Sequence, residues 1–175
     1  MEPVEINAGV YYLRQLRADD LLDDRPALIE AFADADHQRF VLNYRLRNTG
    51  EADRYIARRA AEWARGERCS WAVAEPVTGR LLGEVGLKDL DRASGTAEAT
   101  IWVHPAERRR GVAVTAVNAA VRFGTDALGL REVAYLYHEG NDASAAVARR
   151  CGFRFVDTLV SPDGRKLLRC LRSTR

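Results

Sequence analysis

The sequence predicts a single mixed α/β domain spanning residues 1–175. Segments with the two-residue alternation of strands are interleaved with segments of helical periodicity, and no linker, low-complexity stretch or internal repeat divides the chain. The composition agrees, because 175 residues that are 47% hydrophobic and 30% charged suit one globular core. The predicted order is strand, two helices, three strands, helix, strand, helix and two strands.

The charge balance and the cysteines exclude several classes of protein. Lys and Arg number 27 against 25 Asp and Glu, so the net charge of +2 gives no excess for general nucleic-acid binding. No apolar run reaches the ~18 residues of a membrane span, and the first residues lack a signal-peptide pattern. Three widely spaced cysteines favour reduced thiols, and we expect a cytoplasmic protein with no nucleic-acid or membrane partner. These cysteines are Cys69, Cys151 and Cys170.

The N-terminal third predicts one strand and two helices. Residues 10–16 mix β-branched, aromatic and polar side chains, as a strand does. Asp19 can cap a helix over 19–34, in which Pro26 indicates a kink or a restart. A second helix is expected over about 51–64, where apolar residues recur at helical spacing.

The middle of the chain predicts three strands. Residues 70–75 and 80–88 form an antiparallel hairpin around a turn at 76–79, and 96–103 form the next strand. Alternation along 96–103 divides its side chains between two faces. One face has Glu98, Thr100 and Trp102, and the other has Ala97, Ala99, Ile101 and Val103.

The C-terminal third predicts a helix ending near Leu128, a strand over 132–137 and a short helix over 143–150. A last hairpin pairs 153–160 with 166–171. His37, His104 and His138 have no metal-ligand spacing with one another or with the cysteines, so we expect no metal.

The segment 108–113, Arg-Arg-Arg-Gly-Val-Ala, is the most informative of the chain. It joins a strand to the start of a helix, where backbone N–H groups lack partners and carry positive partial charge. The small residues Gly111 and Ala113 would let an anionic pyrophosphate approach these amides, and three arginines would add charge. Neither GxxxxGK[ST] nor GxGxxG is present, which disfavours a nucleoside triphosphatase or a dinucleotide oxidoreductase. The alternative is a solvated arginine turn before an ordinary helix.

A wider pattern surrounds this loop. Arg108-x-x-Gly111-x-Ala113 follows a strand, and Asn141-x-x-Ser144 and then Cys-Gly-Phe at 151–153 come after it. This ordered set resembles the GNAT-type acyl-CoA-dependent N-acetyltransferases, most closely the branch with the ribosomal-protein N-terminal acetyltransferases. The resemblance covers about residues 10–172. It implies a central, mostly antiparallel mixed sheet of about seven strands flanked by about four helices, splayed between the fourth and fifth strands.

The resemblance implies acetyl-CoA as cosubstrate and assigns residues to it. The pyrophosphate would rest on the amides of Arg108, Arg109, Arg110, Gly111, Val112 and Ala113. The pantetheine arm would lie between Trp102-Val103 and the strand 132–137, with Asn141 near its sulfur end. Val114 and Thr115 replace the Thr-Glu pair common in this branch, which implies a looser hold on CoA or use of Thr115.

The resemblance also assigns the chemistry. Glu98 matches the acidic position that many members use as general base, directly or through water. Ser144 matches a position proposed to protonate the departing thiolate, and Ala148 stands where other branches have a tyrosine. The alternatives are that Glu98 is an exposed or salt-bridged strand residue and that Ser144 contacts backbone or cofactor as a first-turn residue.

The acceptor implied by the resemblance is a primary amine on a protein N-terminus or a small molecule. Residues 1–34 hold eight acids and three bases, which would favour a cationic acceptor there, although such acids also suit a helix start and a solvated face. Three readings stay open: an N-terminal acetyltransferase, a polyamine or resistance acetyltransferase, and a non-catalytic acyl-CoA-binding regulatory module. Family members are often dimers, so a homodimer is open as well.

Overall fold

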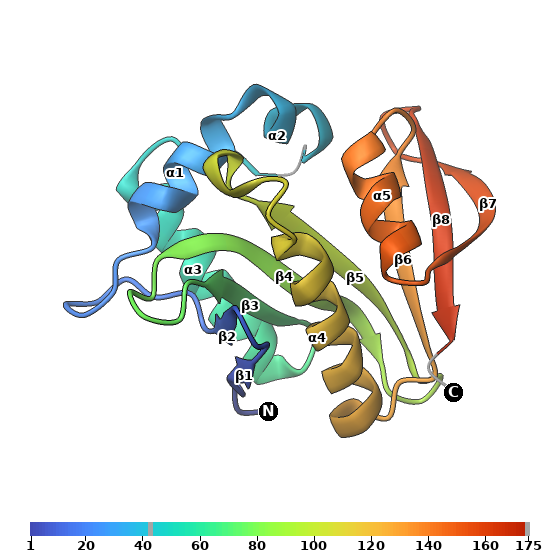
Figure 1. The fold of residues 1–175 in the computed structure, drawn as a ribbon, viewed down its shortest axis with the longest axis horizontal. Coiled ribbons are helices and arrows are strands. Elements are labelled where there is room, and N and C mark those ends of the chain that lie inside the picture. Colours follow the sequence, from blue (N-terminus) through green and yellow to red (C-terminus); the bar gives the residue numbers. More distant parts are fainter. Residues whose placement is uncertain (42–43, 174–175) are drawn as a thin grey trace.

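One mixed sheet is the frame of the molecule, which is described by a computed structural model over residues 1–41 and 44–173. In these residues eight strands lie in the order β1-β2-β3-β4-β5-β6-β8-β7, and only β5 and β6 pair in parallel (Figure 1). The predicted mixed, mostly antiparallel sheet is confirmed, with one strand more than expected. The strands are β1 (Ile6–Asn7), β2 (Tyr12–Arg14), β3 (Cys69–Ala74), β4 (Leu81–Asp91), β5 (Thr96–Val103), β6 (Glu132–His138), β7 (Arg154–Val160) and β8 (Lys166–Ser173).

Helices cover both faces of this sheet. In Figure 1, α4 and α5 lie in front of it and α3 lies behind it. Two apolar cores result, a large one between α4 and strands β3 to β6, and a smaller one that α1 and α3 build on the opposite face. The helices are α1 (Arg25–Ala33), α2 (Ala35–Phe40), α3 (Thr49–Arg65), α4 (Val112–Leu128) and α5 (Asp142–Arg150), with a 3-10 turn η1 (Pro105–Glu107).

The two faces of β5 divide as its alternation predicts. Ala97 and Ala99 are buried in the larger core under α4. Trp102, on the other face, packs against the smaller core with Phe32 and Tyr55. Side chains from one strand therefore reach both cores.

The first helix begins later than the sequence predicts. The structure has α1 from Arg25, with Pro26 in its first turn, where a missing N–H costs nothing. Residues before it form turns, in which the Asp19 carboxylate accepts from the N–H groups of Leu21 and Leu22. Asp19 thus caps a turn and not a helix, so the prediction of a helix over 19–34 is wrong in its first six residues.

Two short elements were not predicted, the two-residue strand β1 and the six-residue helix α2. Asp34 separates α2 from α1, because its backbone is extended (φ −62°, ψ 132°) and its carboxylate accepts from the N–H of His37. One residue therefore ends the first helix through its backbone and caps the second through its carboxylate. With α2, the described residues contain five α-helices, where about four were expected.

A buried ion pair holds α1 on the sheet. Both guanidinium NH groups of Arg14 donate to the Asp24 carboxylate at 2.8 Å, and both side chains are 4% exposed. Asp24 also accepts from the N–H of Arg17 and therefore makes no side-chain cap to α1. The carboxylate at the N-cap position of α1 is therefore used for a tertiary contact.

We expect Asp24→Asn to lower the free energy of unfolding by about 3–5 kcal/mol, because it leaves a buried guanidinium without its counter-charge. Urea denaturation measures the loss. The matched control is Asp23→Asn, which removes a solvent-exposed pair with Arg25 and should cost at most about 1 kcal/mol. Equal costs for the two variants would contradict a structural role of the buried pair.

Candidate functional site

The splay between β5 and β6 opens a cavity of about 780 Å³. Parallel pairing joins Thr96–Ala99 to Glu132–Tyr135 and then stops, although β5 remains paired with β4 up to Val103 and β6 with β8 up to His138. The predicted splay is confirmed. Backbone groups beyond Ala99 and Tyr135 on the facing edges have no strand partner, and such groups need one.

The cavity collects most of the residues that the sequence assigned to a site. α5 and the start of α4 form one wall, the open end of β5 forms the floor, and α2 forms the other wall. Two assigned residues, Glu98 and Arg110, do not line it. Those that do are Trp102, Val103, Arg108, Arg109, Gly111, Val112, Ala113, Asn141 and Ser144.

The loop before α4 has the backbone that an anion site requires. Gly111 is the N-cap of α4 at φ 80°, a left-handed conformation that suits glycine, and no atom lies within 4 Å of where its Cβ would be. No side chain caps the helix start, so its first N–H groups face the cavity mouth without a side-chain acceptor. Val112 and Ala113 extend this amide edge along the cavity wall.

The three arginines of the loop serve different purposes. Arg108 pairs with Asp34 and, at 3.4 Å, with Asp36, so it ties the loop to α2. Arg110 turns to Glu107 at 3.1 Å, and its carbonyl accepts from the hydroxyl of Tyr11 at 2.7 Å.

Arg109 differs from both neighbours. Its side chain makes no ion pair with any residue that the structure describes, and it lines the cavity. Its backbone is left-handed, at φ 66°. Arg109 is therefore the loop cation that is free for a ligand.

Asn141 and Ser144 begin α5 at the cavity wall. The Asn141 side chain accepts from the N–H of Ser144 at 3.0 Å, which makes Asn141 the N-cap. The Ser144 hydroxyl interacts with the phenol of Tyr135, whose pKa burial raises to about 12 against the lowering effect of that hydrogen bond. Ser144 thus lies beside a second, buried hydroxyl that also lines the cavity.

Glu98 lies at the closed end of the splay, one residue before the last paired residue of β5. Its carboxylate forms an ion pair with Lys88 at 2.9 Å and is 18% exposed. Burial raises the pKa of Glu98, although Lys88 acts in the opposite direction. A carboxylate with a raised pKa is closer to the range of a general base, but a water molecule would have to connect it to the cavity.

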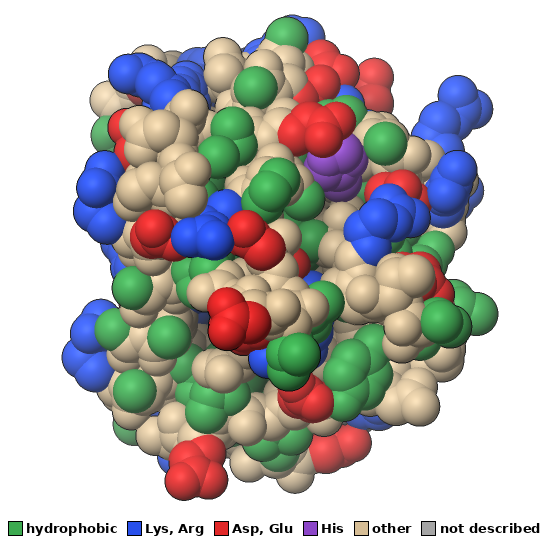
Figure 2. Space-filling model, turned by 90° about the vertical axis from the view of Figure 1, so that its left-hand side faces the viewer, with side chains coloured by type: hydrophobic (Ala, Val, Ile, Leu, Met, Phe, Trp, Pro, Cys, Tyr) green, Lys and Arg blue, Asp and Glu red, His purple; other side chains and the backbone are tan. Residues whose placement is uncertain are grey.

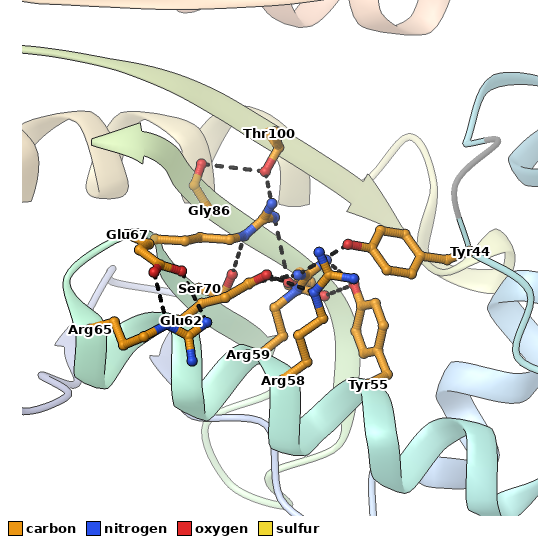
Figure 3. Close-up of polar contacts among 12 residues, drawn as sticks. Tyr44, Tyr55, Arg58, Arg59, Glu62, Arg65, Glu67, Ser70, Gly86 and Thr100 are labelled. Atoms are coloured by element: carbon orange, nitrogen blue, oxygen red, sulfur yellow. Dashed lines mark hydrogen bonds and ion pairs between the residues drawn. The ribbon is translucent and has the colours of Figure 1, made fainter. Parts of the chain in front are cut away.

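A buried carboxylate under the cavity floor fixes Trp102. Glu84 accepts from the indole N–H of Trp102 at 3.2 Å, from the guanidinium of Arg59 at 2.9 Å and from the hydroxyl of Tyr55. Figure 3 shows Tyr55 and Arg59 projecting from α3 toward the sheet. Burial and the nearby Glu84 charge raise the pKa of Tyr55, so its proton stays on the phenol.

Comparison with known families identifies the domain that carries this cavity. Residues 12–154 match the model of an acetyltransferase (GNAT) domain. The chain belongs to the GNAT acetyltransferase family. No curated protein matches this GNAT chain in sequence.

Solved structures share the fold of this GNAT domain. RimJ from Mycobacterium smegmatis, in complex with CoA-disulfide, has a TM-score of 0.84 at 19% identity over 98% of this chain and 88% of that one. RimL, a ribosomal alpha-N-protein acetyltransferase in complex with coenzyme A, has a TM-score of 0.82 at 17% identity over 97% and 98%. Spermidine N-acetyltransferase from Vibrio cholerae, with CoA and spermine, has a TM-score of 0.77 at 16% identity over 94% and 95%. At these identities the likeness establishes the fold alone.

The acids of residues 1–34 do not form the expected negative approach to the site. None of the eight lines the cavity of this GNAT domain. Asp19, Asp23, Asp24 and Asp34 each form an ion pair with an arginine. Figure 2 shows acidic and basic side chains interspersed on the side that carries α1. Four of the eight acids are thus engaged in ion pairs and are not free to attract a cationic acceptor.

The α2 wall contains a site residue that the sequence did not indicate. His37 lines the cavity, is 6% exposed and packs against the rings of Phe32 and Trp102 at centroid distances of 4.2 and 5.7 Å. Its Nε2 has no hydrogen-bond partner in the described structure. The sequence predicted no role for His37, which has no metal-ligand spacing, because nothing in the local sequence indicates that it lies close to Trp102.

No group of three or more His, Cys, Asp and Glu is arranged to hold a metal ion in residues 1–41 and 44–173. Within the same ranges, each helix is too short or too polar to cross a membrane.

The pH dependence of stability should report on His37. Burial lowers its pKa from 6.5 to about 4, so between these values the unfolded chain binds a proton that the folded chain does not. The free energy of unfolding should therefore fall as the pH falls through this window, by about 3 kcal/mol from His37. We expect His37→Phe to remove most of this loss, measured by urea denaturation at pH 7 and pH 4.5. Identical pH slopes in the two proteins would contradict the burial of a neutral imidazole.

Proposed function

We propose that this protein is an acetyl-CoA-dependent N-acetyltransferase that transfers the acetyl group to a primary amine by direct attack in a ternary complex. The observation that carries the proposal is the convergence of three features on one cavity. These are the open amides at the start of α4, the splayed edges of β5 and β6, and the hydroxyl of Ser144. A cytoplasmic location fits the unpaired cysteines.

The cavity residues fit the chemistry of CoA. The N–H groups after Gly111 supply donors to a pyrophosphate, and Arg109 supplies a free cation to it. The backbone N–H and C=O of Val103 face away from β4 and have no strand partner, so they can pair with the amides of an extended pantetheine arm, while the side chain of Trp102 lines the same part of the cavity. The same open edge can donate to the thioester oxygen as negative charge develops on it. Bound acetyl-CoA would contribute the activated acetyl group.

Side chains at the two ends of the splay donate and accept the protons that the reaction transfers. Ser144 donates to the departing thiolate, and Tyr135 beside it can return a proton to the serine. Glu98 accepts the proton of the attacking amine through water at the closed end. Ala148 is buried at 2% exposure, so the position of the missing tyrosine is filled by packing and supplies no acid.

The loop provides the direct test of cofactor placement. We expect acetyl-CoA to raise the melting temperature of the wild-type protein and Gly111→Asp to abolish this shift, because a carboxylate would then stand where the pyrophosphate binds. Differential scanning fluorimetry with and without acetyl-CoA measures both.

The matched control for that variant is Gly129→Asp. Gly129 ends the same helix in the same left-handed conformation (φ 68°) and has equal space around it, but it lies at the opposite end of α4. It should lose stability and keep the shift produced by acetyl-CoA. If the shift survives in Gly111→Asp, the pyrophosphate binds elsewhere.

Glu98→Gln should lower kcat by about 100-fold and leave the acetyl-CoA thermal shift unchanged. The deficit should be largest at low pH and should shrink as the pH approaches the amine pKa, since a neutral amine needs no base. Release of CoA thiol, followed at several pH values with a free-amine peptide, measures it. Asp89→Asn is the control, because Asp89 also contacts Lys88, at 3.4 Å, but is exposed. Equal rates in wild type and Glu98→Gln at every pH would remove Glu98 from the mechanism.

A further inference from the structure

The loop before α4 is held in place from outside the cavity. Arg108 and Arg110 form ion pairs through their side chains, which by themselves do not fix the peptide groups between them. Tyr11 contacts the backbone itself, because its hydroxyl donates to the carbonyl oxygen of Arg110 at 2.7 Å. Among the described residues, this is the only hydrogen bond that joins the backbone of 108–111 to a distant part of the chain.

This contact fixes the direction of one amide. A trans peptide group is planar, so its C=O and its N–H point in opposite directions. The carbonyl of Arg110 points to Tyr11, and neither residue lines the cavity. The N–H of the same peptide group belongs to Gly111, which does line the cavity, and this N–H has no hydrogen-bond partner in the part of the chain that the structure describes. The amide of Gly111 therefore points away from Tyr11, on the side of the loop where the cavity opens.

Local preferences of the chain do not select this direction. Gly111 has φ 80°, but glycine lacks a Cβ and populates negative φ about as readily. Arg109, two residues earlier, also has a left-handed backbone (φ 66°), which is unfavourable for a residue with a side chain. A rotation of the peptide group between residues 110 and 111 would turn the amide away from the cavity. The hydrogen bond from Tyr11 opposes that rotation.

Tyr11 is itself held firmly enough to act as an anchor. It directly precedes β2, which pairs with β3 through Leu13 and Val73, both fully buried. The ring of Tyr11 packs against the larger core, and its carbonyl accepts from the N–H of Ala8 at 3.0 Å. The N-terminal edge of the sheet thus supports a loop that lies 99 residues later in the chain.

We propose that Tyr11 is a positioning residue for the cosubstrate, whose hydroxyl holds the Arg110–Gly111 peptide group so that the Gly111 N–H can donate to a pyrophosphate. This inference rests on the proposed acetyltransferase function. Tyr11 does not line the cavity, so it acts through the loop and not by contact with the cosubstrate. An amide that already points in its donating direction need not be ordered when the pyrophosphate binds. The effect of Tyr11 should therefore be confined to ligands that carry a pyrophosphate.

The test uses Tyr11→Phe, which keeps the ring in the core and removes the hydroxyl. With a free-amine peptide as acceptor, the KM for acetyl-CoA should rise about fivefold, the value of one hydrogen bond, while kcat and the KM for the peptide stay unchanged. Acetylpantetheine is a thioester donor without a pyrophosphate, and its kcat/KM should be equal in Tyr11→Phe and the wild type. ADP carries a pyrophosphate without a thioester, and its inhibition constant against acetyl-CoA should rise about fivefold in the variant.

The matched control is Tyr12→Phe, at the next position. The Tyr12 hydroxyl donates to the Glu5 carboxylate at 2.5 Å, so this substitution also removes a side-chain hydrogen bond from the same segment. That bond has no contact with the loop. Tyr12→Phe should therefore leave the KM for acetyl-CoA and the inhibition constant of ADP unchanged.

An unchanged KM for acetyl-CoA in Tyr11→Phe would overturn the inference, and so would an unchanged inhibition constant of ADP. An equal loss of kcat/KM with acetylpantetheine would reveal a general structural defect and would overturn it too. Failure of the proposed function is distinguishable, because the wild-type protein would then bind no acetyl-CoA or release no thiol with any amine. That result would overturn both proposals, whereas an active wild type with a silent Tyr11→Phe would remove only the role of Tyr11.

Discussion

The end of parallel pairing between β5 and β6 is the constraint on which the rest of the structure depends. Each strand keeps its antiparallel neighbour beyond Ala99 and Tyr135, so the two can separate without either becoming free. Their facing backbone groups are left in an opening bounded by α2, α4 and α5. A sheet that paired along its full length would satisfy these groups internally and would leave no room for an extended chain between the strands.

The opening needs a rigid floor, and buried charge supplies it. Glu84 is 2% exposed, and removal of a carboxylate from water is costly unless its charge is compensated. Compensation comes from Arg59 at 2.9 Å and from the hydroxyl of Tyr55, both on α3, while the indole of Trp102 occupies a further acceptor position. Loss of any partner would leave the charge underpaired, so this network holds α3, β4 and the open end of β5 in one arrangement.

Local patterns in the sequence predicted what local physics decides. The alternation over 96–103 predicted a strand, and the small residues at 111 and 113 predicted a helix start. Both predictions were confirmed. The predicted start of the first helix was wrong, because the Asp19 carboxylate caps a turn at Leu21 and Leu22 and the helix begins only after Asp24, whose carboxylate binds Arg14. The helix α2 is too short to show a period. His37 joins the cavity only through tertiary packing, which no spacing rule could reveal.

The near-neutral net charge conceals the difference between charges that are paired and charges that are not. Four of the eight acids before residue 35 form ion pairs with arginines, and Arg108 and Arg110 of the loop are likewise engaged in ion pairs. The unpaired charges are therefore more informative than the net charge. Arg109 offers an uncompensated cation at the helix start, whereas His37 is buried against Phe32 and Trp102, and this burial keeps its imidazole uncharged by lowering its pKa. A highly charged anionic cosubstrate would then meet a free cation and would not need to displace an existing ion pair.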